Sequence, residues 1–179
     1  SEAELKDIFE SYFAIFPWKK LDAHSEGFDL GCGSGRWAKL VAPKVRQLHC
    51  IDPSKAIKVA QKNLLGLKNC KFYQASADEI PLLNESMDFG YSLGVLHHVP
   101  DTQKALNNCV RKLKPNAPFL VYLYYSFENR PRWFRWIWKS TELLRYLISR
   151  APNSLKYLIC NAIAVIIYLP LARTAKFFK

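Results

Sequence analysis

The feature that most constrains the fold is residues 28–36, FDLGCGSGR, in which a short apolar run enters three glycines at alternate positions. Glycine adopts left-handed backbone angles without steric cost and lets another group approach the backbone closely. A strand, a glycine turn and a helix in this order are typical of the first connection of a doubly wound α/β sheet, where backbone N–H groups face a ligand. Dinucleotide-binding folds prefer G-x-G-x-x-G at this place, and here the last spacing is one residue shorter.

Short apolar runs alternate with helix-like stretches through the first 125 residues. The opening stretch Ser1–Phe16 has apolar residues at helical spacing, with Ser1 as N-cap and Pro17 after it. Alternating strands and helices predict right-handed βαβ units and a mostly parallel, Rossmann-like sheet. The expected strands are Phe28–Leu30, Leu48–Ile51, Lys71–Ala75, Phe89–Leu93 and Phe119–Tyr125, and the expected helices between them are Arg36–Val41, Ser54–Leu65 and Thr102–Leu113.

The chain divides into two parts of different composition. Of its 26 lysines and arginines, ten lie in residues 130–179, where Glu142 is the only acid, and all seven glycines lie at or before Gly94. We therefore predict an α/β domain over residues 1–129 and a basic, aromatic-rich helical segment over 130–179. That segment reads as an amphipathic helix followed, after Pro152, by an apolar helix from Leu155 to Leu169, with a strand over Ile163–Tyr168 as the alternative.

A carboxylate stands where the second expected strand ends. Asp52 follows Gly35 by 17 residues, and a charged acceptor at this place can take hydrogen bonds from both hydroxyls of a ribose. Alone, a glycine run or an Asp before Pro is more often an ordinary turn. Together, in a βαβ frame, they predict nucleoside binding.

Four motifs in order, DLGCGSG, IDPS, ASADEIPL and SMDFGYSLGVLHHVPD, resemble those of class I S-adenosylmethionine-dependent methyltransferases of the type 11 group, over roughly residues 25–126. Within this family the chain is also similar to a bacterial group with PDT, LYY and NRP-x-W signatures. The resemblance implies S-adenosylmethionine as cofactor. It places Asp29, Gly31, Gly33 and Gly35 around the methionine part, Asp52 at the ribose, Ser76 and Ala77 at the adenine, and Leu93 at the floor of the site.

The sequence departs from the family pattern in two respects. Ser76 stands where many relatives have an acid for the adenine amine, so adenine recognition is expected to use backbone groups. The family's sheet normally ends in two further strands, and no convincing pair follows Tyr125. Either the helical part is an insertion and the last two strands are missing, or the sheet is closed differently.

The catalytic residues are not defined by the sequence. Methyl transfer needs in-line approach of a nucleophile, and a general base only if the acceptor must lose a proton. The weak candidates are His97, His98 and Tyr124; Tyr125 and Glu128 are further candidates for acceptor contact. The alternative is that both histidines only bond backbone and shape the pocket. The expected reaction is methylation of a small-molecule or lipid-type acceptor; a non-catalytic nucleoside-binding or membrane-associated module and a nicotinamide-dependent oxidoreductase are the alternatives.

The five cysteines form no C-x-x-C pair and no leader is visible, so we expect reduced cysteines, no metal site and a cytoplasmic protein. Residues 130–179 predict a helical lid over the acceptor pocket or peripheral contact with the inner face of a membrane; nucleic acid is the less favoured partner. A spanning helix is disfavoured at this stage, because only Tyr157–Ala172, 16 residues, is uncharged, against about 20 needed.

Overall fold

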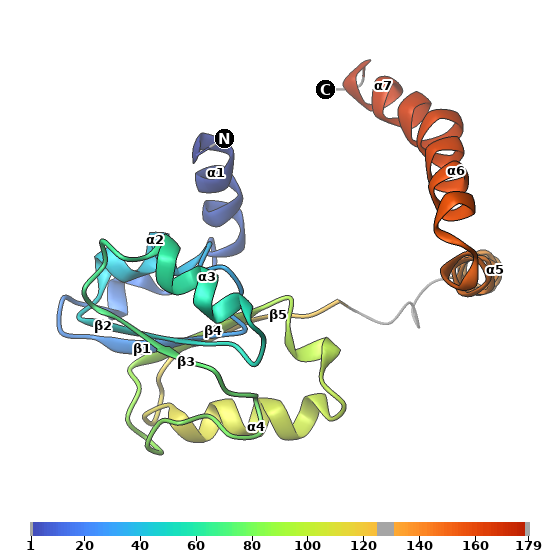
Figure 1. The fold of residues 1–179 in the computed structure, drawn as a ribbon. Coiled ribbons are helices and arrows are strands. Elements are labelled where there is room, and N and C mark those ends of the chain that lie inside the picture. Colours follow the sequence, from blue (N-terminus) through green and yellow to red (C-terminus); the bar gives the residue numbers. More distant parts are fainter. Residues whose placement is uncertain (1, 125–130, 178–179) are drawn as a thin grey trace. The chain divides into compact units, whose positions relative to one another are not determined.

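The computed structural model describes residues 2–124 and 131–177, in two compact units divided after Tyr124 (Figure 1). The first unit is a five-stranded, all-parallel sheet of order β3-β2-β1-β4-β5. The strands are β1 (Glu26–Leu30), β2 (Gln47–Ile51), β3 (Cys70–Tyr73), β4 (Phe89–Leu93) and β5 (Phe119–Tyr122). The doubly wound α/β fold and its five expected strands are confirmed.

Helices cover both faces of this sheet, as a parallel sheet requires. Figure 1 shows α1, α2 and α3 on one face and α4 on the other. The helices are α1 (Glu2–Tyr12), α2 (Ala38–Val41), α3 (Ala56–Asn63) and α4 (Thr102–Lys112), with 3₁₀ turns at Trp18–Lys20, Ala42–Lys44 and Leu96–His98. Asp101 caps α4, because its side chain accepts a hydrogen bond from the backbone N–H of Lys104 at 2.9 Å.

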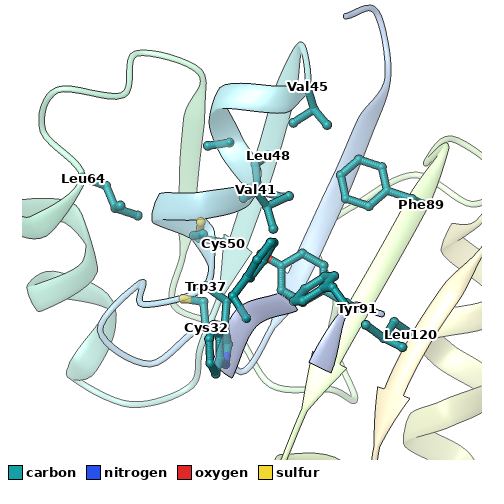
Figure 2. Close-up of a cluster of buried hydrophobic side chains, with 14 of the residues drawn as sticks. Cys32, Trp37, Val41, Val45, Leu48, Cys50, Leu64, Phe89, Tyr91 and Leu120 are labelled. Carbon is teal, nitrogen blue, oxygen red and sulfur yellow. The ribbon is translucent and has the colours of Figure 1, made fainter. Parts of the chain in front are cut away.

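Two hydrophobic clusters hold these layers together. One lies under α1, α2 and α3 and contains Trp37, Val41, Leu64 and Tyr91 (Figure 2). The other lies under α4 and is built from Phe28, Leu30, Ile51, Leu96, Cys109 and their neighbours. Because alternate side chains of a strand point to opposite faces, Phe28 and Leu30 belong to the α4 face while Asp29 faces the other cluster.

The two central strands, β1 and β4, pack through rings lying over glycines. Phe28 is paired in register with Gly90, and Gly27 with Phe89. A Cβ on Gly90 would lie 2.4 Å from the Phe28 ring, and a Cβ on Gly27 would lie 2.4 Å from the Phe89 ring. Each ring therefore occupies the space that a side chain on the neighbouring strand would need.

The second unit is helical in all its described residues except Pro131, Ala151 and Pro152. It contains α5 (Arg132–Arg150), α6 (Asn153–Ile163), a π-helical segment (Ala164–Tyr168) and α7 (Leu169–Phe177). The alternative of a strand over Ile163–Tyr168 is wrong, because these residues continue the helix. The described residues after Tyr122 contain no further strand.

The glycine at position 90 gives a test of this packing. We expect Gly90→Ala to destabilise the fold by about 1–3 kcal/mol, the usual cost of overpacking a filled core. Gly66→Ala is the matched control, because a Cβ there meets nothing within 4 Å, and it should change stability by less than about 1 kcal/mol. Urea unfolding of the three proteins measures both, and equal stability of the two variants would contradict the proposed packing.

Candidate functional site

The strand order places the candidate site at one edge of the sheet. The chain runs outward from β1 through β2 to β3, and then returns to β4 on the other side of β1. Ligands of open α/β sheets bind outside the carboxyl ends of the strands at such a reversal. The regular pairing of β1 with β4 ends at Asp29 and Tyr91, and beyond it the Ser92 hydroxyl donates to the Leu30 carbonyl at 3.0 Å.

The glycine loop after β1 has the backbone geometry that its sequence predicts. Gly31, Gly33 and Gly35 have φ angles of 76°, 54° and 81°. A Cβ on Gly31 would lie 2.3 Å from Val95, and one on Gly35 would lie 2.7 Å from Leu64, so the outer two glycines are needed for packing. A Cβ on Gly33 would meet nothing within 4 Å, which leaves its backbone open to a ligand.

The helix after this loop is shorter than expected. The sequence predicts a helix over Arg36–Val41, but α2 begins at Ala38 and has four residues. The helix-type hydrogen bond from the Lys39 N–H to the Gly35 carbonyl, at 3.0 Å, already begins in the loop. The backbone N–H groups expected to face the ligand therefore belong to the loop as well as to α2.

Asp52 connects the end of β2 to this loop. Its carboxylate is buried and accepts hydrogen bonds from the backbone N–H of Gly33 at 2.9 Å, from the backbone N–H of Ser54 at 2.9 Å and from the Ser54 hydroxyl at 2.6 Å. An ionised carboxylate has about four lone-pair sites, so one remains for a ribose hydroxyl. Asp52 lies at the end of β2, where the resemblance predicts the ribose to bind, and it also shapes the loop.

Asp29 is buried next to Tyr91 beneath the loop. Its side chain is 1% exposed, and neither its Oδ2 atom nor the Tyr91 hydroxyl has a hydrogen-bond partner among the described residues. Burial raises the pKa of Asp29 to about 8; the nearby Tyr91 hydroxyl opposes this rise and the negative charge of Asp52 adds to it. An unpaired buried carboxyl oxygen fits a cofactor that carries an ammonium group.

The segment predicted to face the adenine follows β3. The Ser76 hydroxyl accepts from the backbone N–H of Asp78 at 3.2 Å, and Ala77 is buried. The Asn108 side chain in α4 donates to the Ala77 carbonyl at 3.0 Å and holds the segment in place. Sequence reasoning missed Asn108, because nothing in the local pattern links it to a residue 31 positions away.

His97 lies in an aromatic group after β4 and β5. Leu93 is half-buried at the end of β4, and Gly94 follows it with a φ of 76°. The His97 ring lies 4.0 Å from the His98 ring and 4.4 Å from the Tyr124 ring, measured between centroids. Both His97 ring nitrogens are covered and have no hydrogen-bond partner among the described residues. Desolvation, with a smaller contribution from His98, lowers the pKa of His97, so this imidazole is neutral at pH 7.

Two tyrosines that the sequence reasoning did not single out extend this group. The Tyr12 ring of α1 meets the Tyr122 ring at 4.9 Å, and Tyr122 lies 5.7 Å from Tyr124. Helical spacing identifies Tyr12 only as a core residue, so no signal in the sequence predicts its contact with Tyr122. Tyr125 and Glu128, also predicted near the acceptor, lie outside the described residues.

The described residues contain no cluster of three His, Cys, Asp or Glu side chains that could hold a metal ion. The fold and the edge together define a doubly wound α/β domain that suits a nucleoside-containing cofactor at the reversal between β1 and β4.

Comparison with known proteins identifies this class more closely. A family model described as a methyltransferase domain matches residues 28–121. The uncharacterized methyltransferase YcgJ of Bacillus subtilis is 30% identical over 106 residues, which cover 56% of this chain and 41% of YcgJ. The ubiquinone/menaquinone biosynthesis C-methyltransferase UbiE of Rickettsia peacockii is 31% identical over 149 residues, which cover 70% of this chain and 60% of UbiE. The chain thus spans about half the length of these relatives.

Solved structures of methyltransferases also resemble this chain. The crystal structure of YcgJ matches with a TM-score of 0.57 at 25% identity, over 68% of this chain and 50% of that one. A putative sarcosine dimethylglycine methyltransferase from Galdieria sulphuraria matches with a TM-score of 0.54 at 30% identity, over 62% and 43%. The chain belongs to the class I S-adenosylmethionine-dependent methyltransferase family, and its cofactor is S-adenosylmethionine.

The raised pKa of Asp29 predicts a pH effect on stability without added cofactor. The folded protein keeps Asp29 protonated up to about pH 8, whereas the unfolded chain releases this proton near the ordinary value of 3.8, so stability falls as pH rises between these values. The Asp29→Asn variant has no carboxyl group at this position, so its stability should lack this pH dependence. Relative to the variant, the wild type should lose on the order of a few kcal/mol between pH 5 and pH 8 in urea unfolding. Parallel pH profiles would contradict the assignment.

Removal of the Asp52 carboxylate tests the ribose position. We expect Asp52→Ala to weaken S-adenosylhomocysteine binding by about 1–3 kcal/mol, since a charged hydrogen-bond acceptor is lost. Asp101→Ala is the matched control, because it also removes a carboxylate that holds a backbone N–H, but at the α4 cap. Isothermal titration should find its affinity within about twofold of wild type. Equal affinities for all three proteins would show that Asp52 does not hold the ribose.

Proposed function

We propose that the protein transfers the methyl group of S-adenosylmethionine to a small-molecule or lipid-type acceptor that binds at the aromatic group formed by Tyr12, His97, Tyr122 and Tyr124. The observation that carries this proposal is a neutral His97 whose ring nitrogens have no hydrogen-bond partner in the part of the chain that the structure describes. Tyr124 and Tyr122 are 65% and 38% exposed at the same edge, and their rings, which meet edge to face, offer an aromatic, largely apolar surface. UbiE, by its name a C-methyltransferase of quinone biosynthesis, gives independent support for a lipid-type acceptor.

The chain's own residues would bind the cofactor, orient the acceptor and keep water away from the reacting atoms. The glycine loop and Asp52 would hold the nucleoside, and the Asp29 carboxylate would face the ammonium of the methionine part. The cofactor supplies a methyl group already activated on a positively charged sulfur. The acceptor's nucleophilic atom forms its bond to the methyl carbon in line with the carbon–sulfur bond that breaks, whose electron pair stays on sulfur. Where the acceptor then carries an excess proton, a neutral His97 nitrogen takes it.

A paired substitution tests the role of His97. His97→Gln should lower turnover by 10²-fold or more if it is the base, with S-adenosylhomocysteine affinity unchanged within about twofold. His98→Gln is the control, because this neighbouring ring is exposed, and it should keep turnover within about threefold. Transfer of a labelled methyl group to quinol and phospholipid acceptors measures turnover. Wild-type turnover should also fall toward acid pH, because a protonated imidazole cannot accept a proton, and the lowered pKa of His97 puts this fall at a more acid pH than for an ordinary histidine.

Each alternative function predicts a different outcome. Equal turnover of His97→Gln and the wild type would leave both histidines as residues that shape the pocket. Donor binding without transfer to any acceptor would favour a non-catalytic nucleoside-binding module. The family match favours S-adenosylmethionine over a nicotinamide cofactor, and tight NADH binding in place of S-adenosylhomocysteine would reverse that conclusion.

The proposal includes contact of residues 130–179 with the cytoplasmic face of a membrane. In α5, Trp133 and Trp136 are 64% and 73% exposed, and Arg132, Arg135 and Lys139 share the helix with them. Aromatic rings prefer the membrane interface, and cations meet the phosphates of anionic lipids there. A lipid-type acceptor would be reached from the same surface.

A further inference from the structure

The helix that follows α5 has the length of a bilayer. The stretch Asn153–Ala175, of 23 residues, lies within the continuous helix that α6, the π-helical segment and α7 form (Figure 1). At about 1.5 Å per residue it is roughly 34 Å long, against about 30 Å of hydrocarbon in a membrane. By length and composition this helix can cross a membrane. The uncharged stretch Tyr157–Ala172 is shorter than the helix because Lys156 and Arg173 flank it, and both of these cations lie near the ends of the helix.

The apolar side chains of this helix point in all directions. At 100° per residue, Tyr157, Leu158 and Ile163 of α6 lie about 100–140° apart around the axis, and they are 73%, 66% and 39% exposed. Among the described residues of the unit, none of its most apolar window is buried. A partner helix or a docking groove covers one stripe of a helix, whereas an all-round apolar surface needs an all-round apolar environment. A bilayer provides that environment.

The polar residues lie where a spanning helix tolerates them. Lys156 and Arg173 stand near the two ends, about 26 Å apart along the axis, and long cationic side chains can extend to the lipid headgroups. Pro170 lies close to the far end, two residues after the π-helical segment Ala164–Tyr168, which is a local adjustment of the kind that accommodates proline in membrane helices. The Thr174 hydroxyl donates within the helix, to the carbonyls of Pro170 and Leu171 at 3.1 and 3.0 Å.

The order of the elements defines an orientation. The basic helix α5, with Arg135, Lys139, Arg145 and Arg150, directly precedes Asn153, and its proposed contact with the cytoplasmic face keeps the amino end of the spanning helix at that face. The methyltransferase domain lies on this same side in the sequence.

We infer that Asn153–Ala175 crosses the bilayer once, with its amino end at the cytoplasmic face and α5 lying along that anionic surface. The membrane contact is then a permanent anchor rather than a peripheral one. The inference rests on the proposed membrane contact, and it does not depend on the identity of the catalytic base.

Labelling of two matched cysteines tests the crossing. Ser154→Cys and Thr174→Cys each stand one residue inside an end of the helix, and Cys160→Ala removes the one cysteine that is exposed. The full chain is synthesised in the presence of sealed vesicles of three parts phosphatidylcholine to one part phosphatidylglycerol, so that the domain stays outside. A membrane-impermeant maleimide should label Ser154→Cys in intact vesicles, and label Thr174→Cys at least tenfold more after detergent than before. The Cys160→Ala chain without an added cysteine gives the background.

Every other outcome overturns the crossing. Equal labelling of both positions in intact vesicles would place the helix along the surface. A chain that stays in the supernatant would favour the helical lid over the acceptor pocket. Binding of S-adenosylhomocysteine, titrated in the same samples, reports separately on the donor site, so a failed anchor and a failed methyltransferase domain are distinguishable.

A charge in the middle of the helix gives a second measurement. Val165→Lys puts a cation near the bilayer centre, and Leu155→Lys puts the same cation at the cytoplasmic end. After an alkaline carbonate wash, Val165→Lys should leave at least fivefold less chain in the vesicle pellet than wild type, while Leu155→Lys should match wild type. Equal retention of both variants would contradict a spanning helix.

Discussion

The hydrogen bonds between the glycine loop and the end of β2 are the constraint on which the donor site depends. The backbone N–H groups of Gly31 and Cys32 donate to the Ile51 carbonyl at 2.7 and 3.1 Å, and Gly33 donates to Asp52. These bonds fix a loop whose glycines have left-handed backbone angles. They also hold the Asp52 carboxylate, which is predicted to bind the nucleoside, against this loop. The positions predicted for the methionine part and the ribose are therefore parts of one hydrogen-bonded unit.

Two side chains near the candidate site have polar atoms that are covered at a cost in folding free energy, which fits a binding function. Asp29 is buried with a pKa of about 8 and an oxygen that no described residue pairs with, an arrangement that stability alone would not favour. His97 likewise has two covered ring nitrogens without a partner among residues 2–124 and 131–177. Buried polar groups are normally satisfied, so these two mark places where a ligand is expected to complete the hydrogen bonding. They lie beneath the glycine loop and after β4, on the donor and acceptor sides of the proposed reaction.

In the second unit the groups that lack a suitable environment are apolar rather than polar, because none of the most apolar window of its long helix is buried. A bilayer would cover the helix Asn153–Ala175, and headgroups would meet the cations of α5. Such an anchor would hold the methyltransferase domain next to a pool of apolar acceptors. Proposed function and inferred anchor thus fit one arrangement, although each has its own test.

The sequence by itself determined the strands, the sheet class and the donor motifs, because hydrophobic periodicity and glycine spacing are local signals. It also indicated the basic, helical back end. The one-turn length of α2, the Asn108 anchor and the meeting of Tyr12 with Tyr122 were decided only by tertiary structure, since each depends on residues distant in the chain. The same holds for the distinction between His97 and His98. Adjacent histidines are equivalent in a sequence, and only the tertiary packing covers the ring nitrogens of His97 and leaves His98 exposed.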